Sequence, residues 1–248
     1  MKRRIKLFSI SIFCIVLNIM SANTVFSQGS EIAEIQAAIQ AKGANWTAGE
    51  SWVTKLNSEE RRALLGENTD VLSPVEPETL SFDTDAPSAI DWRNKDGHNW
   101  ITPIRDQQSC GSCVAFGSVA TLESLIRIEK NLPNQNIDLS EMHLFNCNGG
   151  KCSNGWYNSS ACYNLKNNGT PDEDCWPYQP VDRQCSNTCS DWESRAVKIT
   201  SYGAISGIQA HMNYVAIAPV LVSYEVYTDF YSYSGGIYEQ TWGDYEGG

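Results

Sequence analysis

Hydrophobic residues recur at helical spacing in two parts of the chain. Near the N-terminus, Ile32, Ile35 and Ile39 lie three and four residues apart, which predicts a helix with one apolar face. The same spacing of Val, Leu and Ile predicts one long helix over residues 114–130, which ends before Pro133. Each of these helices should bury one face against the rest of the fold.

End signals in the sequence predict another short helix. In NSEERRALLG, Asn57 is placed to cap the N-terminus, Glu60 follows three residues later, and Gly66 stops the helix. Over residues 67–87 the chain turns to Asp, Glu, Ser, Thr and Pro without periodicity. This composition is typical of an exposed linker that proteases cut easily.

The second half of the chain has a different composition. Residues 134–192 are rich in Cys, Asn, Gly and Pro, which predicts a loop-rich region held by disulfides. Two later runs, VKITSYGAI (197–205) and APVLVSYEV (218–226), are rich in β-branched and aromatic residues and predict strands. The order of these segments predicts an α+β fold in which a helical lobe precedes a β lobe.

The first 27 residues are predicted to be a secretory signal peptide. Four basic residues at positions 2–6 precede an apolar stretch over 7–20, and small side chains lie just before Ser27. We therefore expect export to a secreted, periplasmic or other extracytoplasmic location, or to a lysosome-like compartment in a eukaryote. The apolar stretch is short for a bilayer-spanning helix, and no membrane span is expected in the mature chain.

The charge of the chain disfavours polyanionic partners. The formal net charge is −11, and removal of the four basic residues of the signal would bring it to −15. A protein this acidic repels phosphates, so neither nucleic acid nor anionic lipid is an expected partner.

Eight of the nine cysteines lie outside the signal, and in an oxidising compartment disulfides are their default use. Zinc would require paired CxxC units or histidines at metal-binding spacing. The chain has one CxxC, at 110–113, and its three histidines (His98, His143 and His211) are scattered. No metal and no cofactor are expected.

Cys113 lies directly before the predicted long helix, where the helix dipole and unpaired N–H groups favour a thiolate. Such a thiol suits nucleophilic attack on a carbonyl. Alternatively, Cys110 and Cys113 are both disulfide halves, or they pair with each other as a redox couple. The short, polar, proline-containing stretch before them and the six further cysteines disfavour the redox couple.

Several segments together resemble papain-like cysteine peptidases, the cathepsin family. They follow the order of that family along the chain: DWR (91–93), DQQSCGSCVAF (106–116), LSEMHLFNC (139–147), CSNGW (152–156), CWPY (175–178) and VYTDFYSYSGGIY (226–238). The last segment is most similar to cathepsin B, and residues 45–66 are similar to the short cathepsin B-type propeptide.

The resemblance implies roles for four residues. Cys113 matches the nucleophile, and Gln107 matches the glutamine whose amide helps to form the oxyanion hole with the nucleophile's own backbone N–H. Gly155 matches the glycine whose backbone pairs with an extended substrate. Ser223 falls near the main specificity pocket, which in the family reads the P2 side chain.

The resemblance also implies the disulfides and the domain organisation. The implied bridges are Cys110–Cys152, Cys147–Cys185 and Cys175–Cys189, and Cys162 is left over. The bridge Cys175–Cys189 resembles an extra bridge of cathepsin C-like relatives. Residues 28–88 would be a propeptide and linker that inhibits the enzyme intramolecularly. Residues 89–248 would form a two-lobed peptidase domain with its cleft between the lobes, acting on protein or peptide substrates.

The sequence also departs from the family pattern. Val114 replaces the usual tryptophan, Asn154 replaces the first glycine of a Gly-Gly pair, and the chain has no His-containing insertion like the occluding loop of cathepsin B, which implies an endopeptidase. The family's His and Asn lie about 130–150 residues after the nucleophile. We therefore expect a chain truncated before its catalytic His, with an incomplete β-barrel lobe and little activity of its own.

Two other functions remain open at this stage. A catalytically inactive relative that acts as a binding or inhibitory protein would also fit Val114, Asn154 and the missing His. A thiol–disulfide oxidoreductase would instead require a bond between Cys110 and Cys113.

Overall fold

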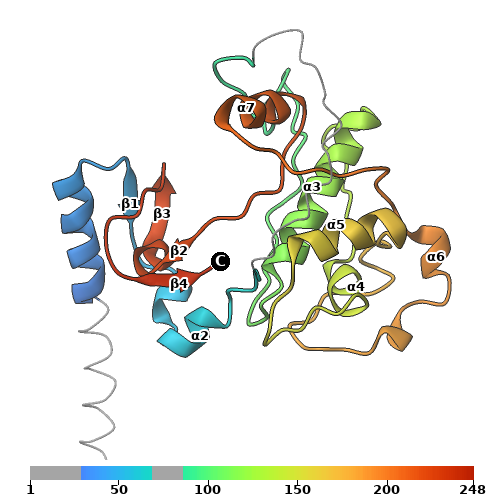
Figure 1. The fold of residues 1–248 in the computed structure, drawn as a ribbon, viewed down its shortest axis with the longest axis horizontal. Helices are drawn as coiled ribbons and strands as arrows, with labels where there is room; N and C mark the ends of the chain where they lie inside the picture. Colours follow the sequence, from blue (N-terminus) through green and yellow to red (C-terminus); the bar gives the residue numbers. More distant parts are fainter. Residues whose placement is uncertain (1–28, 69–85) are drawn as a thin grey trace, which may run out of the picture. The chain divides into compact units, whose positions relative to one another are not determined.

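The computed structural model describes residues 29–68 and 86–248, which divide into two compact units (Figure 1). The first unit contains the described residues up to Arg61 together with Val226–Glu246. The second contains Arg62–Glu225 and Gly247–Gly248. The predicted signal peptide and most of the predicted linker lie outside the described residues.

The second unit is built on three helices, α3 (Cys113–Glu129), α4 (Glu141–Asn146) and α5 (Asn158–Asn167), which pack against one another. The prediction of one long helix at 114–130 is therefore confirmed. Its apolar face, with Val119 and Leu122, packs in a core with Phe145 and Trp156. The unit also contains η2 (Cys185–Asn187), α6 (Trp192–Arg195) and α7 (Ile208–Ile217).

Three disulfides join the loops of this unit, in the pairing that the family resemblance implied. They link Cys110 to Cys152, Cys147 to Cys185, and Cys175 to Cys189. Among the described cysteines, Cys113 and Cys162 are not part of a disulfide.

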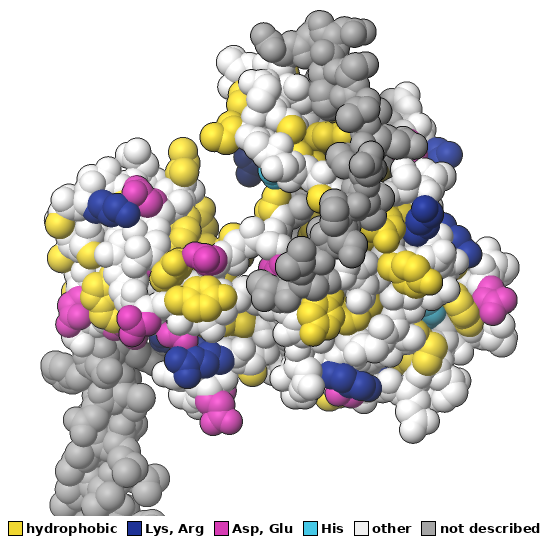
Figure 2. Space-filling model, viewed as in Figure 1, with side chains coloured by type: hydrophobic (Ala, Val, Ile, Leu, Met, Phe, Trp, Pro, Cys, Tyr) yellow, Lys and Arg dark blue, Asp and Glu magenta, His cyan; other side chains and the backbone are white. Residues whose placement is uncertain are grey.

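The prediction that the two β-rich runs form strands was wrong. Within 197–205 the ladder is limited to an isolated bridge from Val197 to Thr170, and within 218–226 only Val226 is in a strand. Between them the chain forms α7, whose exposed Ile208 and Ile217 contribute to the hydrophobic surface over this helix in Figure 2. High β propensity describes side chains that fit a sheet, and a strand forms only where a partner strand is available.

The first unit combines the N-terminal helix with two small sheets. Residues 29–42 are helical, and β1 (Trp46–Ala48) pairs antiparallel with β3 (Tyr233–Gly236), while β2 (Val226–Tyr227) pairs with β4 (Tyr245–Gly247). The remaining elements are η1 (Val53–Lys55), α2 (Ser58–Arg62) and η3 (Thr228–Ser232).

The N-terminal helix packs as its hydrophobic pattern predicts. Ile35 and Ile39 are buried together with Trp46, and Tyr238 packs against the same cluster. The predicted capping box also forms, since the backbone N–H of Glu60 donates to Asn57 Oδ1 at 2.9 Å and that of Asn57 donates to Glu60 Oε2 at 2.8 Å. The helix it starts ends at Arg62, earlier than the predicted stop.

None of the helices in the described ranges is both long and apolar enough to span a bilayer.

Candidate active site

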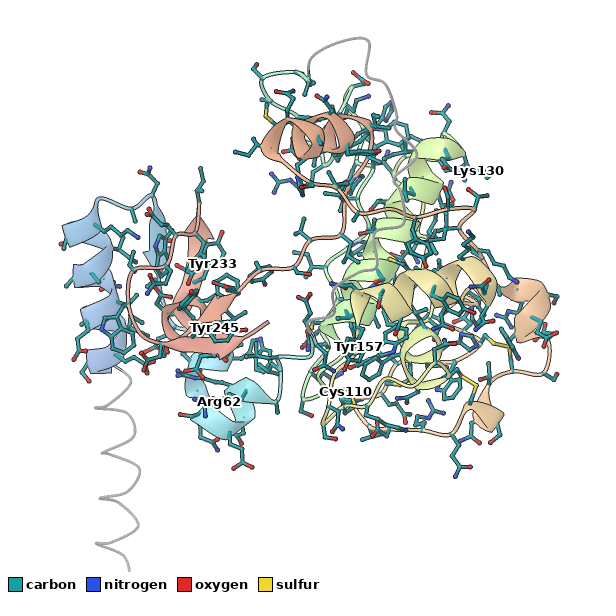
Figure 3. The ribbon with its side chains drawn as sticks, in the orientation of Figure 1. Arg62, Cys110, Lys130, Tyr157, Tyr233 and Tyr245 are labelled. Carbon is teal, nitrogen blue, oxygen red and sulfur yellow. A yellow bond between two sulfur atoms is a disulfide. The ribbon has the colours of Figure 1, made fainter. Side chains whose placement is uncertain are left out.

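Cys113 and Cys110 have separate chemical states. Cys110 is fully buried and bonded to Cys152, and the backbone N–H of Gly111 donates to the Cys152 carbonyl at 3.0 Å. Cys113 carries a free, half-buried thiol as the first residue of α3. Figure 3 labels Cys110 near this end of α3 and Lys130 near the other. Cys110 and Cys113 are therefore not bonded to each other, whereas the two cysteines of an oxidised redox couple would be.

The surroundings of Cys113 raise the pKa of its thiol. Burial is the main cause, hydrogen bonding to the backbone of Gly66 and Val114 lowers the pKa, and the negative charge of Glu67 raises it. The thiolate expected from the helix terminus is thus disfavoured in this covered state, because loss of water outweighs the helix dipole. Two of these neighbours, Gly66 and Glu67, lie in residues 64–68, upstream of the predicted peptidase domain.

Gln107 lies where a peptide carbonyl can reach its side chain. Its Nε2 donates to the Leu64 carbonyl and to the Cys110 carbonyl, each at 2.8 Å. The amide that the family resemblance assigns to the oxyanion hole therefore holds the carbonyl oxygen of Leu64.

Tyr178 contacts the loop before α3 at two points, Gln107 and Ser112. Its hydroxyl donates to the Gln107 carbonyl at 2.7 Å and lies 2.9 Å from the Ser112 hydroxyl. Burial raises the pKa of Tyr178 to about 12, so the hydroxyl keeps its proton. The sequence placed Tyr178 in a family motif but gave no sign of this hydrogen-bonding role.

Gly155 allows another backbone to approach closely. Its φ is +68°, and a Cβ at this position would lie 2.1 Å from the Gly66 carbonyl oxygen. The next residue, Trp156, donates its N–H to that oxygen at 2.7 Å and accepts from the N–H of Asn68 at 2.8 Å. Residues 64–68 therefore run beside Gly155 and Trp156 as an extended peptide would.

Ser223 meets the same segment through a side chain. Its hydroxyl donates to Glu67 Oε1, and Asn158 Nδ2 donates to the same oxygen at 2.8 Å and to the Ser223 hydroxyl at 2.7 Å. All the sequence-predicted site residues of this unit thus gather around residues 64–68. Asn158 was not predicted, because an asparagine that starts a helix carries no distinguishing signal.

A sequence profile described as "Papain family cysteine protease" matches residues 86–247. This chain belongs to the papain family. Among curated relatives, Cysteine proteinase 1 of Entamoeba histolytica is 40% identical over 124 residues, which cover 49% of this chain and 37% of that protein. Cathepsin B-like CP3 of Giardia intestinalis is 32% identical over 177 residues, which cover 66% and 58% of the two chains.

Solved structures show the same papain-like fold. The procathepsin B S9 of Trypanosoma congolense has a TM-score of 0.69 at 22% identity and covers 87% of this chain and 79% of that one. The digestive procathepsin L2 of Tenebrio molitor has a TM-score of 0.70 at 22% identity, covering 95% and 76%. The predicted mixed fold of helices and sheet is confirmed. The chain spans 37–45% of the length of the first curated relatives it matches.

The three histidines of this papain-family chain contact residues outside the candidate site. His143 is buried on α4, where its ring lies 4.7 Å from that of Trp192, and burial lowers its pKa to about 4. His98 stacks edge-on against Trp100, and His211 Nδ1 lies 2.8 Å from the Gly207 carbonyl of its own helix.

One cluster among the described residues has metal-binding atoms within 4.8 Å of one another, and it contains His143, Cys147 and Cys185. The two sulfurs are bonded to each other, so they offer no thiolate to a metal while the bridge is intact.

Buried carboxyl groups lie behind the site. Burial raises the pKa of Glu141 to about 8 and that of Glu173 to about 7. Glu173 Oε1 accepts from the backbone N–H of Tyr178 at 2.5 Å. Glu173 thus supports the loop of Tyr178, and neither carboxyl is among the groups that shift the pKa of Cys113.

Proposed function

We propose that this chain is the precursor of a secreted papain-like cysteine endopeptidase that hydrolyses peptide bonds in proteins or peptides. Cys113 is the nucleophile, and the Gln107 amide and the Cys113 backbone N–H stabilise the oxyanion. One observation carries the proposal: Gln107 Nε2 already binds a peptide carbonyl, that of Leu64, in a segment that also contacts the Cys113 thiol. A bound peptide, a free thiol and an oxyanion donor thus meet in one place.

The proposed reaction has two stages. The thiolate of Cys113 forms a bond to the carbonyl carbon, and the carbonyl electrons move to the oxygen, where Gln107 donates a hydrogen bond. As the carbonyl re-forms, the C–N bond breaks and the amine leaves with a proton. Water then attacks the resulting thioester, which releases the acid and restores the thiol. No cofactor takes part in either stage.

A proton carrier is required, because Cys113 must lose its proton and the leaving amine must gain one. We propose that a histidine, oriented by an asparagine, supplies this function from a part of the protein outside the printed sequence. The surroundings of His98, His143 and His211 support this, since their rings contact Trp100, Trp192 and the Gly207 carbonyl rather than Cys113. The short share of the relatives that this chain spans also supports it.

The precursor state follows from the path of residues 64–68. We propose that residues 1–27 direct export and that 28–88 form the propeptide and linker, which blocks the peptidase domain at 89–248 until it is cut. The hydrogen bonds from Gln107, Trp156 and Asn68 that hold this segment support the assignment.

The experiment is a comparison of peptide hydrolysis by the protein and two variants, each measured after the propeptide has been cut. Gln107→Ala should lower kcat about 100-fold with little change in KM, because the lost donor acts on the transition state. The control Gln108→Ala changes an exposed neighbour and should leave both values unchanged. Equal loss in both variants, or none in either, would refute the role of Gln107. Protein that hydrolyses no peptide even after the propeptide has been cut would favour the inactive binding protein.

A further inference from the structure

The side chain of Glu67 is held by two neutral donors. Asn158 Nδ2 and the Ser223 hydroxyl both donate to Glu67 Oε1, and Asn158 Nδ2 also reaches the Ser223 oxygen at 2.7 Å. Asn158 is the first residue of α5, and Ser223 lies in the segment before β2. Glu67 Oε1, Asn158 Nδ2 and the Ser223 hydroxyl therefore each hydrogen-bond to the other two.

The backbone on either side fixes where this side chain points. Trp156 donates to the Gly66 carbonyl at 2.7 Å and accepts from Asn68 at 2.8 Å, so Glu67 is clamped between two hydrogen bonds to a single residue. Any peptide that follows this path must present one side chain to Asn158 and Ser223. These two residues are thus placed to select that side chain.

The remaining hydrogen-bonding capacity of Asn158 identifies the preferred group. Among the buried polar atoms of the described residues, Asn158 Oδ1 has no hydrogen-bond partner. A buried acceptor without a donor is destabilising, and a carboxylate offers no donor to relieve that cost. A primary amide offers both parts, because its oxygen replaces Glu67 Oε1 while its NH₂ can donate to Asn158 Oδ1.

We infer that Asn158 and Ser223 select a peptide side chain that ends in a primary amide, a glutamine, at the place where the pro-segment carries Glu67. Glutamate binds less well because it leaves Asn158 Oδ1 unpaired, and leucine binds worst because it also removes the acceptor of the hydrogen bonds from Asn158 Nδ2 and Ser223. This inference rests on the proposed function only where the bound peptide is called a substrate. Binding in the precursor tests it separately.

The first experiment uses the pro-segment as its own ligand. In full-length protein carrying Cys113→Ala, which cannot cut itself, hydrogen exchange is followed at the Asn68 amide and along α3. Relative to Glu67, Glu67→Gln should slow exchange at Asn68 about threefold or more, and Glu67→Leu should accelerate it about tenfold or more. The control Glu59→Leu, at an exposed position of α2, should leave this exchange unchanged.

A second variant shows whether Asn158 causes the ranking. In the Asn158→Ala background the Glu and Gln forms should exchange at equal rates, while protection along α3 shows that the unit is still folded. A Leu form protected as well as the Gln form, or a Gln advantage that survives Asn158→Ala, would overturn the inference.

Substrate hydrolysis gives an independent readout. Peptides with Gln, Glu or Leu as the second residue before the scissile bond should be cut with kcat/KM in that order, and Asn158→Ala should bring the Gln and Glu values together. If no peptide is cut, the proposed function fails, but the exchange ranking still decides whether Asn158 selects an amide.

Discussion

Gly66 is the position at which the pro-segment passes closest to the nucleophile loop. A Cβ there would lie 2.0 Å from the Gly111 carbonyl oxygen and 2.4 Å from its carbon, far inside contact distance. The Gly111 backbone cannot yield easily, because it is tied to the Cys110–Cys152 bridge and hydrogen-bonded to Cys152. Gly66→Ala should therefore displace the pro-segment rather than the nucleophile loop.

The size of the effect follows from the hydrogen bonds lost with that displacement. The bonds from Trp156 N–H to the Gly66 carbonyl and from Gln107 Nε2 to the Leu64 carbonyl would both break. At about 0.5–1.5 kcal/mol each, their loss shifts the equilibrium toward an uncovered Cys113 by about 1–3 kcal/mol. This corresponds to a roughly five- to 150-fold larger uncovered fraction.

The assay is the rate of Cys113 alkylation by iodoacetamide, followed by mass spectrometry of the Cys113 peptide. Gly66→Ala should accelerate alkylation by that factor, and removal of the Glu67 charge from the thiol should act in the same direction. The control is Gly29→Ala, because a Cβ at Gly29 would meet nothing within 4 Å. Equal alkylation rates in the two variants would refute the view that residues 64–68 cover Cys113.

Two further predictions concern the support of the site. Tyr178→Phe removes the hydroxyl between the Gln107 carbonyl and Ser112, and urea unfolding should show that the free energy of unfolding falls by about 1–3 kcal/mol. The control Tyr163→Phe, at an exposed position, should leave it unchanged, and an equal effect of both variants would contradict the role of the hydroxyl. Because the carboxyl of Glu141 has a pKa of about 8 when folded and 4.5 as its ordinary value, its contribution to stability is fully present below pH 4.5 and is lost as the pH rises toward 8. Urea unfolding at pH 5 and pH 8 should therefore show that Glu141→Gln gains stability relative to the unchanged protein at the higher pH; a pH-independent difference would contradict the raised pKa.

Local signals in the sequence predicted the parts of the fold that depend on neighbouring residues. The spacing of isoleucines located the N-terminal helix, and Asn57 and Glu60 located the capping box, because these interactions lie within one or two helical turns. The strands failed for the opposite reason. The run at 197–205 has suitable side chains, but a strand depends on a partner that the sequence pattern does not specify.

The candidate site shows the same division. Cys113 and Gln107 are six residues apart in a recognisable motif, so the sequence alone located both. Asn158 and Tyr178 act through contacts with Glu67 and Gln107 that span 91 and 71 residues of the chain. Their roles depend on the tertiary fold and could not be assigned before the structure placed these segments together.

The central claim is that Cys113 is the nucleophile of a peptidase, and an acyl-enzyme trap tests it most directly. The protein, with its propeptide cut, is mixed with a peptide ester, quenched in acid within one turnover, and digested for mass spectrometry. The acyl group should appear on Cys113 and not on Cys162, the other described cysteine outside a disulfide, and Cys113→Ala should abolish both adduct and turnover. Ester turnover that survives Cys113→Ala, or an adduct on Cys162, would contradict the claim.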